Sequence, residues 1–117
     1  VAGAFHTPFM ASAAEGLAKV VERLNFKDAT IPLIANTTGL PITAADDIRA
    51  ELLKQLTESV YWQKSVEYMI DQGVGTFVEI GPGKVLTGLT RRINRDVRTM
   101  NISDAQTIKN MQTGTWN

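Results

Sequence analysis

Apolar residues recur at intervals of three and four over four stretches of the chain, which is the spacing of an amphipathic helix. Thr7 with Pro8 suits the start of the first helix, Thr43 suits the cap of the second, and Gly73 suits the end of the third. The first predicted helix begins after Thr7 and extends to Leu24, and the second begins after Thr43 and extends to Leu56. The third begins after Ser59 and ends near Gly73, and the fourth spans residues 85–93.

Two short, continuous apolar runs predict buried strands, over residues 31–36 and 77–80, with Pro32 at the start or edge of the first. Strands that alternate with helices favour an α/β fold with parallel strands. Because two strands cannot form a stable parallel sheet covered on both faces, we expect further strands from elsewhere. Residues 1–102 are predicted to form one α/β part, and residues 103–117 a polar tail with a possible short helix, in which Trp116 has no clear role.

The composition is that of one globular domain: 117 residues, 44% hydrophobic and 21% charged. Twelve basic and twelve acidic side chains balance, so no overall field would attract nucleic acid or a membrane. The chain has no cysteine, which excludes disulfides and thiolate metal sites, and no apolar run near the ~20 residues of a membrane span. We expect a soluble cytoplasmic protein. Because the chain starts at Val1 without Met, we expect an internal segment.

His6 is the only histidine, and it lies just before the first predicted helix. An imidazole can accept and return a proton near neutral pH, as a general base must for a serine or cysteine nucleophile. This chain has no cysteine and no Gly-x-Ser-x-Gly elbow. His6 is therefore predicted either to be one part of an incomplete catalytic site or to pack or cap near the helix.

Three further features allow two interpretations each. Residues 81–84, Gly-Pro-Gly-Lys, precede a helix and suit either an anion site or, preferably, a tight turn. Glu79 is predicted to accept hydrogen bonds from nearby loop N–H groups instead of acting as an acid or base. Four arginines at the end of the fourth helix suit either a solvated helix end or a docking patch for an acidic carrier. These are Arg91, Arg92, Arg95 and Arg98.

Four blocks of sequence, in order and spacing, resemble the malonyl-CoA:acyl carrier protein transacylases of bacterial fatty acid synthesis. The resemblance covers almost the whole chain, and only the tail after Ile102 stays outside it. The blocks are GAFHTPFM (3–10), IPLIAN (31–36), QLTESVYW (55–62) and EIGPGKVLTGL (79–89).

The resemblance implies the C-terminal part of a large α/β-hydrolase-like subdomain, whose sheet is incomplete without an N-terminal part. That part would hold the serine nucleophile, the arginine for the malonyl carboxylate and the oxyanion-hole donors. His6 matches the catalytic histidine, which the family orients by backbone carbonyls, one of them at the position of Gln55. Asn36 matches an asparagine that supports the site. Many relatives have two adjacent asparagines there, whereas this chain has Ala35-Asn36. Phe5, just before His6, matches a position at which, in related polyketide acyltransferases, Phe favours malonyl over methylmalonyl.

The implied substrate is malonyl-CoA, the implied partner is acyl carrier protein, and no metal or redox cofactor is implied. Two alternatives remain open. The first is a segment of a polyketide synthase acyltransferase. The second is a non-catalytic module that binds a carrier or another subunit.

Overall fold

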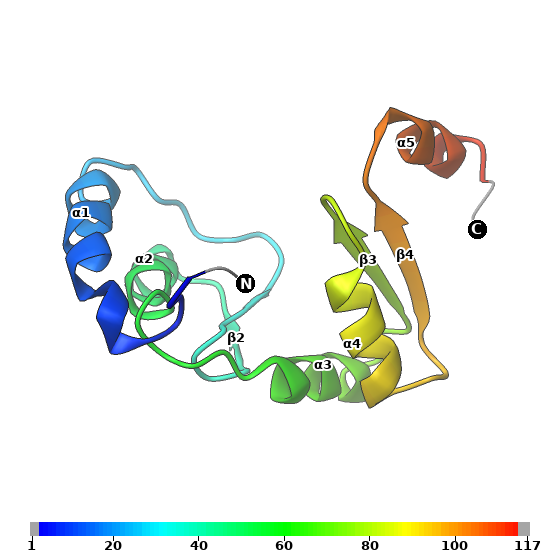
Figure 1. The fold of residues 1–117 in the computed structure, drawn as a ribbon, viewed down its shortest axis with the longest axis horizontal. Helices are drawn as coiled ribbons and strands as arrows, with labels where there is room; N and C mark the ends of the chain where they lie inside the picture. Colours follow the sequence, from blue (N-terminus) through cyan, green and yellow to red (C-terminus); the bar gives the residue numbers. More distant parts are fainter. Residues whose placement is uncertain (1–2, 115–117) are drawn as a thin grey trace. The chain divides into compact units, whose positions relative to one another are not determined.

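The structure, a computed structural model, describes residues 3–114 (Figure 1). The chain divides into two compact units, Val1–Tyr68 and Met69–Asn117, and the division falls within helix α3. Trp116 and Val1, both singled out in the sequence, lie outside the described residues. The elements are η1 (Pro8–Met10), α1 (Ala11–Val21), β1 (Leu33–Ile34), β2 (Pro41–Ile42), α2 (Ala45–Lys54), α3 (Trp62–Asp71), β3 (Thr76–Ile80), α4 (Val85–Ile93), β4 (Arg98–Ile102) and α5 (Ala105–Gln112).

The first predicted helix is confirmed, as a turn of 3₁₀ helix continued by α1, with Thr7 and Pro8 at its start as predicted, but without a side-chain cap and with an earlier end. Thr7 precedes η1 without capping it, because its hydroxyl donates to the carbonyl of Ala4 at 2.6 Å. At the other end, the N–H groups of Arg23 and Leu24 bond to carbonyls three residues back. The chain therefore tightens into a turn, and Leu24 lies beyond the helix.

The first predicted strand is shorter than expected and its pairing is antiparallel. Only Leu33–Ile34 is extended, and it pairs with Pro41–Ile42, a strand that the sequence reasoning missed. Gly39 adopts a positive φ of 67°, and its N–H donates to the carbonyl of Ala35. Because a tight turn returns the chain directly, the expectation of parallel strands is wrong for this part of the chain.

Helix α2 begins at Ala45, so the prediction that Thr43 caps it is wrong. The side chain of Asp28 accepts the N–H of Ala45 at 2.9 Å, which satisfies one of the free donors at the helix start. Asp46 and Asp47 do lie in the first turn, as predicted. A residue seventeen positions earlier thus supplies the cap, which no local pattern indicates.

The second unit holds a pair of parallel strands, β3 and β4, with α4 against them (Figure 1). β3 was predicted, whereas β4 was missed because its sequence, Arg-Thr-Met-Asn-Ile, has no continuous apolar run. The short tail helix is confirmed as α5, capped by Asp104, which accepts the N–H of Thr107. The α/β class with short parallel strands is therefore correct for this unit.

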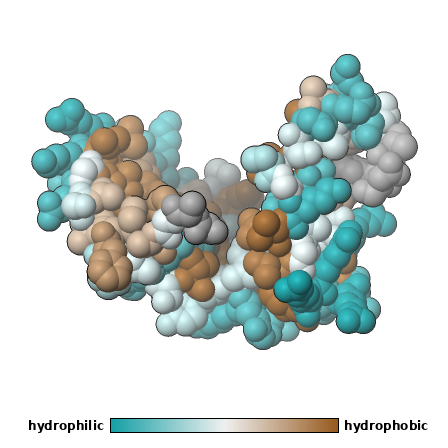
Figure 2. Space-filling view, in the orientation of Figure 1, coloured by the Kyte–Doolittle hydropathy of each residue, from teal (hydrophilic) through white to brown (hydrophobic). Residues whose placement is uncertain are grey.

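Large apolar side chains remain open to solvent on each unit, where Figure 2 shows brown surface. Phe9 is 87% exposed in the first unit and Ile80 is 79% exposed in the second. Val78 and Ile80 alternate along β3 with the partly buried Phe77 and Glu79. A parallel sheet normally has both faces covered, whereas Val78 and Ile80 of β3 are exposed within the described part of the chain. Within residues 3–114, no helix has the length and apolar character to cross a membrane.

Candidate functional site

His6 is held by two consecutive backbone carbonyls that follow the end of α2. Its N–H donates to the carbonyl of Leu56 at 3.0 Å, and its Nδ1 lies 2.6 Å from the carbonyl oxygen of Gln55. The backbone at His6 has a φ of 62°, in the left-handed region that non-glycine residues seldom occupy. Such a conformation costs about 1–3 kcal/mol and is concentrated at functional sites. The two carbonyls hold the residue there.

The contact with Gln55 determines which ring nitrogen of His6 carries the proton. A carbonyl oxygen can only accept, so Nδ1 must be the N–H donor in this contact. In the neutral ring, Nε2 then keeps a lone pair and can accept a proton. Gln55 is the C-cap of α2, so its carbonyl is one of the free acceptors at the end of that helix. The arrangement therefore suits a general base.

Asn36 contacts the side chain of Gln55 and not the imidazole. Its Nδ2 lies 3.5 Å from Gln55 Oε1, and its carbonyl accepts the N–H of Tyr61 at 2.8 Å. The structure thus brings His6, Gln55 and Asn36 together from three separate segments of the first unit. Gln55 serves His6 through its backbone, so the identity of its side chain matters to Asn36 rather than to the imidazole.

The sequence reasoning missed a polar pair next to this group, Thr37 and Glu51. Glu51 accepts the N–H of Thr37 at 3.0 Å and its hydroxyl at 2.8 Å, one bond at each carboxylate oxygen. Thr37 is only 8% exposed. The signal available in the sequence was weak, because a glutamate within a polar helix resembles any solvated residue.

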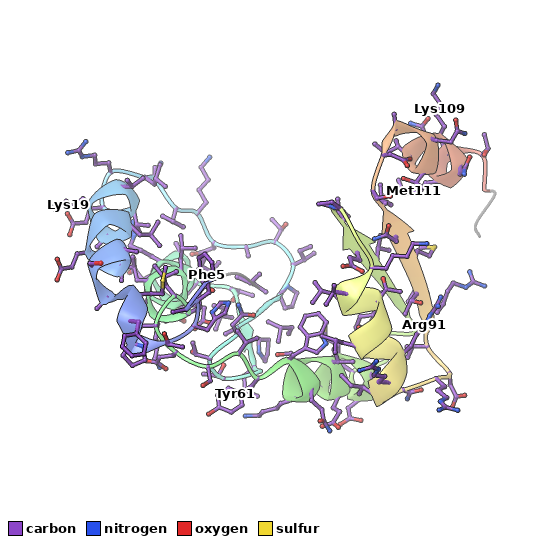
Figure 3. All side chains as sticks on the ribbon, viewed as in Figure 1. Phe5, Lys19, Tyr61, Arg91, Lys109 and Met111 are labelled. Carbon is purple, nitrogen blue, oxygen red and sulfur yellow. The ribbon has the colours of Figure 1, made fainter. Side chains whose placement is uncertain are left out.

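Phe5 lies immediately before His6, and its side chain is 50% exposed (Figure 3). The ring lies over the backbone of Gly3, where an added Cβ would be 2.7 Å from Phe5 Cε2. A side chain at position 3 would therefore push the ring from its place. Phe5 as a whole is half exposed.

The predicted arginine patch is in the second unit, where three of its four arginines border one pocket. An open pocket of about 350 Å³ is bordered by Arg91, Arg92, Arg95 and Val97. Arg91, labelled in Figure 3, donates from Nε to the hydroxyl of Thr99 at 2.6 Å, which fixes its guanidinium. Arg98 lies in β4, so the prediction that it belongs to the helix end is wrong.

Glu79 lies near the end of β3, and its carboxylate accepts hydrogen bonds from N–H groups at the start of α4, in line with the predicted acceptor role. Its carboxylate accepts the hydroxyl of Thr87 at 2.6 Å, the N–H of Thr87 at 2.8 Å and the N–H of Leu86 at 3.2 Å. The bonds from Thr87 hold the pKa of Glu79 below its ordinary value. Gly81 and Gly83 adopt positive φ, which a tight turn at residues 81–84 requires, so the geometry is in keeping with the preferred interpretation of this segment as a turn.

Residues 3–114 contain no group of three or more side chains suited to hold a metal ion.

Comparisons with known proteins converge on one kind of enzyme. No family model matches the chain. The chain is 42% identical over 109 residues to the malonyl CoA-acyl carrier protein transacylase of Bacillus subtilis, covering 93% of this chain and 34% of that protein. The acyl-carrier-protein-S-malonyltransferase of Bartonella henselae superposes with a TM-score of 0.86 at 35% identity, covering 98% of this chain and 37% of the other.

A third match is a malonyl-transacylase solved in complex with its type II PKS acyl-carrier protein. Its TM-score is 0.84 at 35% identity, covering 97% of this chain and 37% of that one. The chain therefore spans about a third of the length of the relatives that it matches, and it corresponds to a C-terminal portion of them.

Proposed function

We propose, from the finding that this chain is a C-terminal portion of a malonyl-CoA:acyl carrier protein transacylase, that it supplies the general base for malonyl transfer. The donor is malonyl-CoA and the acceptor is the phosphopantetheine thiol of acyl carrier protein, in cytoplasmic fatty acid synthesis. The single observation that carries the proposal is the Nδ1 contact of His6 with the Gln55 carbonyl, which leaves Nε2 as the proton acceptor.

The serine nucleophile would come from a part of the protein outside this chain, as the resemblance implies. His6 Nε2 takes the serine proton while the serine oxygen attacks the thioester carbonyl of malonyl-CoA. The tetrahedral intermediate collapses, the C–S bond breaks, and the imidazolium returns the proton to the CoA thiolate. In the second half, the carrier's thiol gives its proton to Nε2 and attacks the malonyl ester, and the proton returns to the serine oxygen.

In this scheme, the end of α2 takes the place of the aspartate of a Ser-His-Asp triad, which orients the histidine. The Gln55 carbonyl holds the ring in the required tautomer, and the helix end stabilises the positive charge that forms on His6. A carbonyl carries no full charge, so it stabilises the imidazolium less than a carboxylate would. Asn36 supports the arrangement by its contact with the Gln55 side chain.

Phe5 is proposed to form one wall of the acyl pocket. Phe5 is adjacent to the proposed base in sequence, and the residue is half exposed. An extra methyl on the malonyl group would meet the ring, although discrimination by one methyl is worth only about 1–3 kcal/mol.

Two surfaces would serve partners. Arg91, Arg92 and Arg95 border one open pocket and present positive charge to an acidic carrier. The exposed apolar residues of each unit, such as Ile80 on β3, would be covered by the remaining two thirds of the enzyme. In this proposal, the chain completes the large α/β-hydrolase-like subdomain of that enzyme.

The test is His6→Ala in the chain assembled with the serine-bearing part. General-base catalysis contributes about 10²–10⁴-fold, so we expect kcat to fall by that factor while malonyl-CoA still binds. Asn110→Ala, in α5 of the other unit, serves as the matched control. Mass spectrometry after adding malonyl-CoA should find the malonyl group on the serine-bearing part and never on this chain. Near-normal turnover of the His6 variant would exclude the proposed role.

A further inference from the structure

We propose that Glu51 is a positioning residue for His6, which acts by clamping Thr37 to α2. The clamp fixes the end of the helix whose following carbonyls hold the histidine. The inference rests on the proposed role of His6 as the base, and it adds a residue that neither the sequence pattern nor the resemblance assigned.

The clamp uses the whole carboxylate of Glu51. Oε1 accepts the backbone N–H of Thr37 at 3.0 Å, and Oε2 accepts its hydroxyl at 2.8 Å. Hydrogen bonds to an ionised acceptor are about twice as strong as neutral ones. Thr37 is 8% exposed, so water has little access to replace these bonds if the carboxylate is removed.

Three contacts connect the clamp to the imidazole. Asn36, the neighbour of Thr37, reaches Gln55 Oε1 with a long bond of 3.5 Å, which is too weak to hold the two segments by itself. The N–H of Gln55 donates to the backbone carbonyl of Glu51 at 2.9 Å, so Gln55 is joined by a helical bond to the residue whose carboxylate forms the clamp. The carbonyl of Gln55 then meets His6 Nδ1 at 2.6 Å. The carboxylate therefore sets the distance between the β1 turn and the helix end, and this distance governs the His6 contact.

Glu79 and Thr87 show the same pairing in the second unit, where one carboxylate takes both the N–H and the hydroxyl of a threonine. There the threonine belongs to the helix that the carboxylate caps. Thr37 lies outside α2, fourteen residues before Glu51, so the first-unit pair joins two separate segments. A function in holding the site together follows from this difference.

The experiment uses the intact 117-residue chain and needs no catalytic activity, because His6 is the only histidine and gives one set of imidazole signals. The ¹⁵N chemical shifts of its two ring nitrogens report the tautomer directly. In the unaltered chain we expect the Nδ1–H form to dominate. Glu51→Ala and Thr37→Val should each shift the signals toward a mixture of tautomers, with Glu51→Gln intermediate.

The matched control is Glu58→Ala. Glu58 lies near the same helix end, is exposed, and makes only a surface ion pair of 3.7 Å with Lys54. The Glu58→Ala substitution removes the same charge as Glu51→Ala and should leave the His6 tautomer unchanged. If Glu51→Ala does not fold, Thr37→Val, which keeps the backbone N–H bond, carries the test. In the assembled enzyme, the clamp variants should lower kcat about tenfold, the low end of the range found when the outer partners of a metal-bound histidine are removed.

Each outcome bears on a different claim. A folded Glu51→Ala or Thr37→Val chain with an unchanged Nδ1–H signal overturns the positioning role and leaves the base function of His6 intact. An unaltered chain without the Nδ1–H form overturns the positioning role as well, because the Gln55 contact would not hold. The base function itself is decided separately, by the turnover of the His6→Ala enzyme.

Discussion

Reversing two arginines of the docking patch should weaken transfer to the carrier protein while sparing the chemistry. Arg91→Glu with Arg92→Glu changes two of the three positive residues that border the open pocket. Both lie in the last turn of α4, and neither takes part in the described hydrogen bonds of His6. The resulting enzyme should therefore still form the malonyl ester at its normal rate.

The magnitude follows from the exposure of these side chains. An exposed ion pair contributes about 0.2–1 kcal/mol, and reversal adds a repulsion of similar size, so two reversals cost about 1–4 kcal/mol at low salt. At physiological ionic strength, the Debye length of about 8 Å reduces this effect. We expect KM for the carrier to rise about tenfold. Arg91 should matter more than Arg92, because its bond to Thr99 already orders its guanidinium.

The assay measures kcat/KM for acyl carrier protein at several salt concentrations, alongside malonyl transfer to a small pantetheine thiol. The control is Lys19→Glu with Arg23→Glu, two exposed positions near α1 that change the net charge equally. An unchanged KM for the carrier would refute docking at this patch. An equal rise in the control would show that net charge acts instead of a local surface.

Two further predictions concern Phe5 and Glu79. Phe5→Ser should raise the use of methylmalonyl relative to malonyl by about 1–3 kcal/mol, measured as the ratio of kcat/KM values, and an unchanged ratio would contradict the wall role. Glu79→Gln should lower the free energy of unfolding at neutral pH, because the carboxylate is stabilised by bonds from Thr87 and Leu86. Since the pKa of Glu79 is lowered in the folded state, its contribution is present above the ordinary carboxyl pKa and lost as pH falls through the lowered value. The free energies of unfolding of the unaltered protein and the Glu79→Gln variant, measured with denaturant, should therefore differ at neutral pH and converge in acid. A difference that does not depend on pH would exclude this account.

Local patterns predicted the helices well because each depends on the spacing of its own residues. The spacing of apolar residues located α1 to α4, and the weak pattern of the tail located α5. Helix ends were less well predicted, because the group that satisfies a terminal N–H can come from far along the chain. Asp28 accepts an N–H at the start of α2, and Glu79 in β3 accepts an N–H in the first turn of α4. The acceptor role of Glu79 was anticipated from its place before a turn.

Strand pairing was the weakest part of the prediction. β1 joined β2 through a turn at Gly39, and β4 carried too little apolar sequence to be recognised. A strand is stabilised by partners that the linear sequence does not place beside it, so its direction and neighbours are decided only on folding.

The sequence by itself determined that His6 is the one residue able to move a proton near neutral pH, and its surrounding block indicated the transacylases. The resemblance named the backbone carbonyl of Gln55 as a partner of the histidine, whereas the second bond, to the carbonyl of Leu56, and the left-handed backbone at His6 came only from the tertiary structure. The carbonyls of Gln55 and Leu56 lie some fifty residues away, and backbone carbonyls carry no signature in a sequence. The carboxylate of Glu51 appeared as an ordinary helix residue until the β1 turn brought Thr37 against it. The chemistry of each side chain can be identified from the sequence, whereas its hydrogen-bond partners depend on how distant segments pack together.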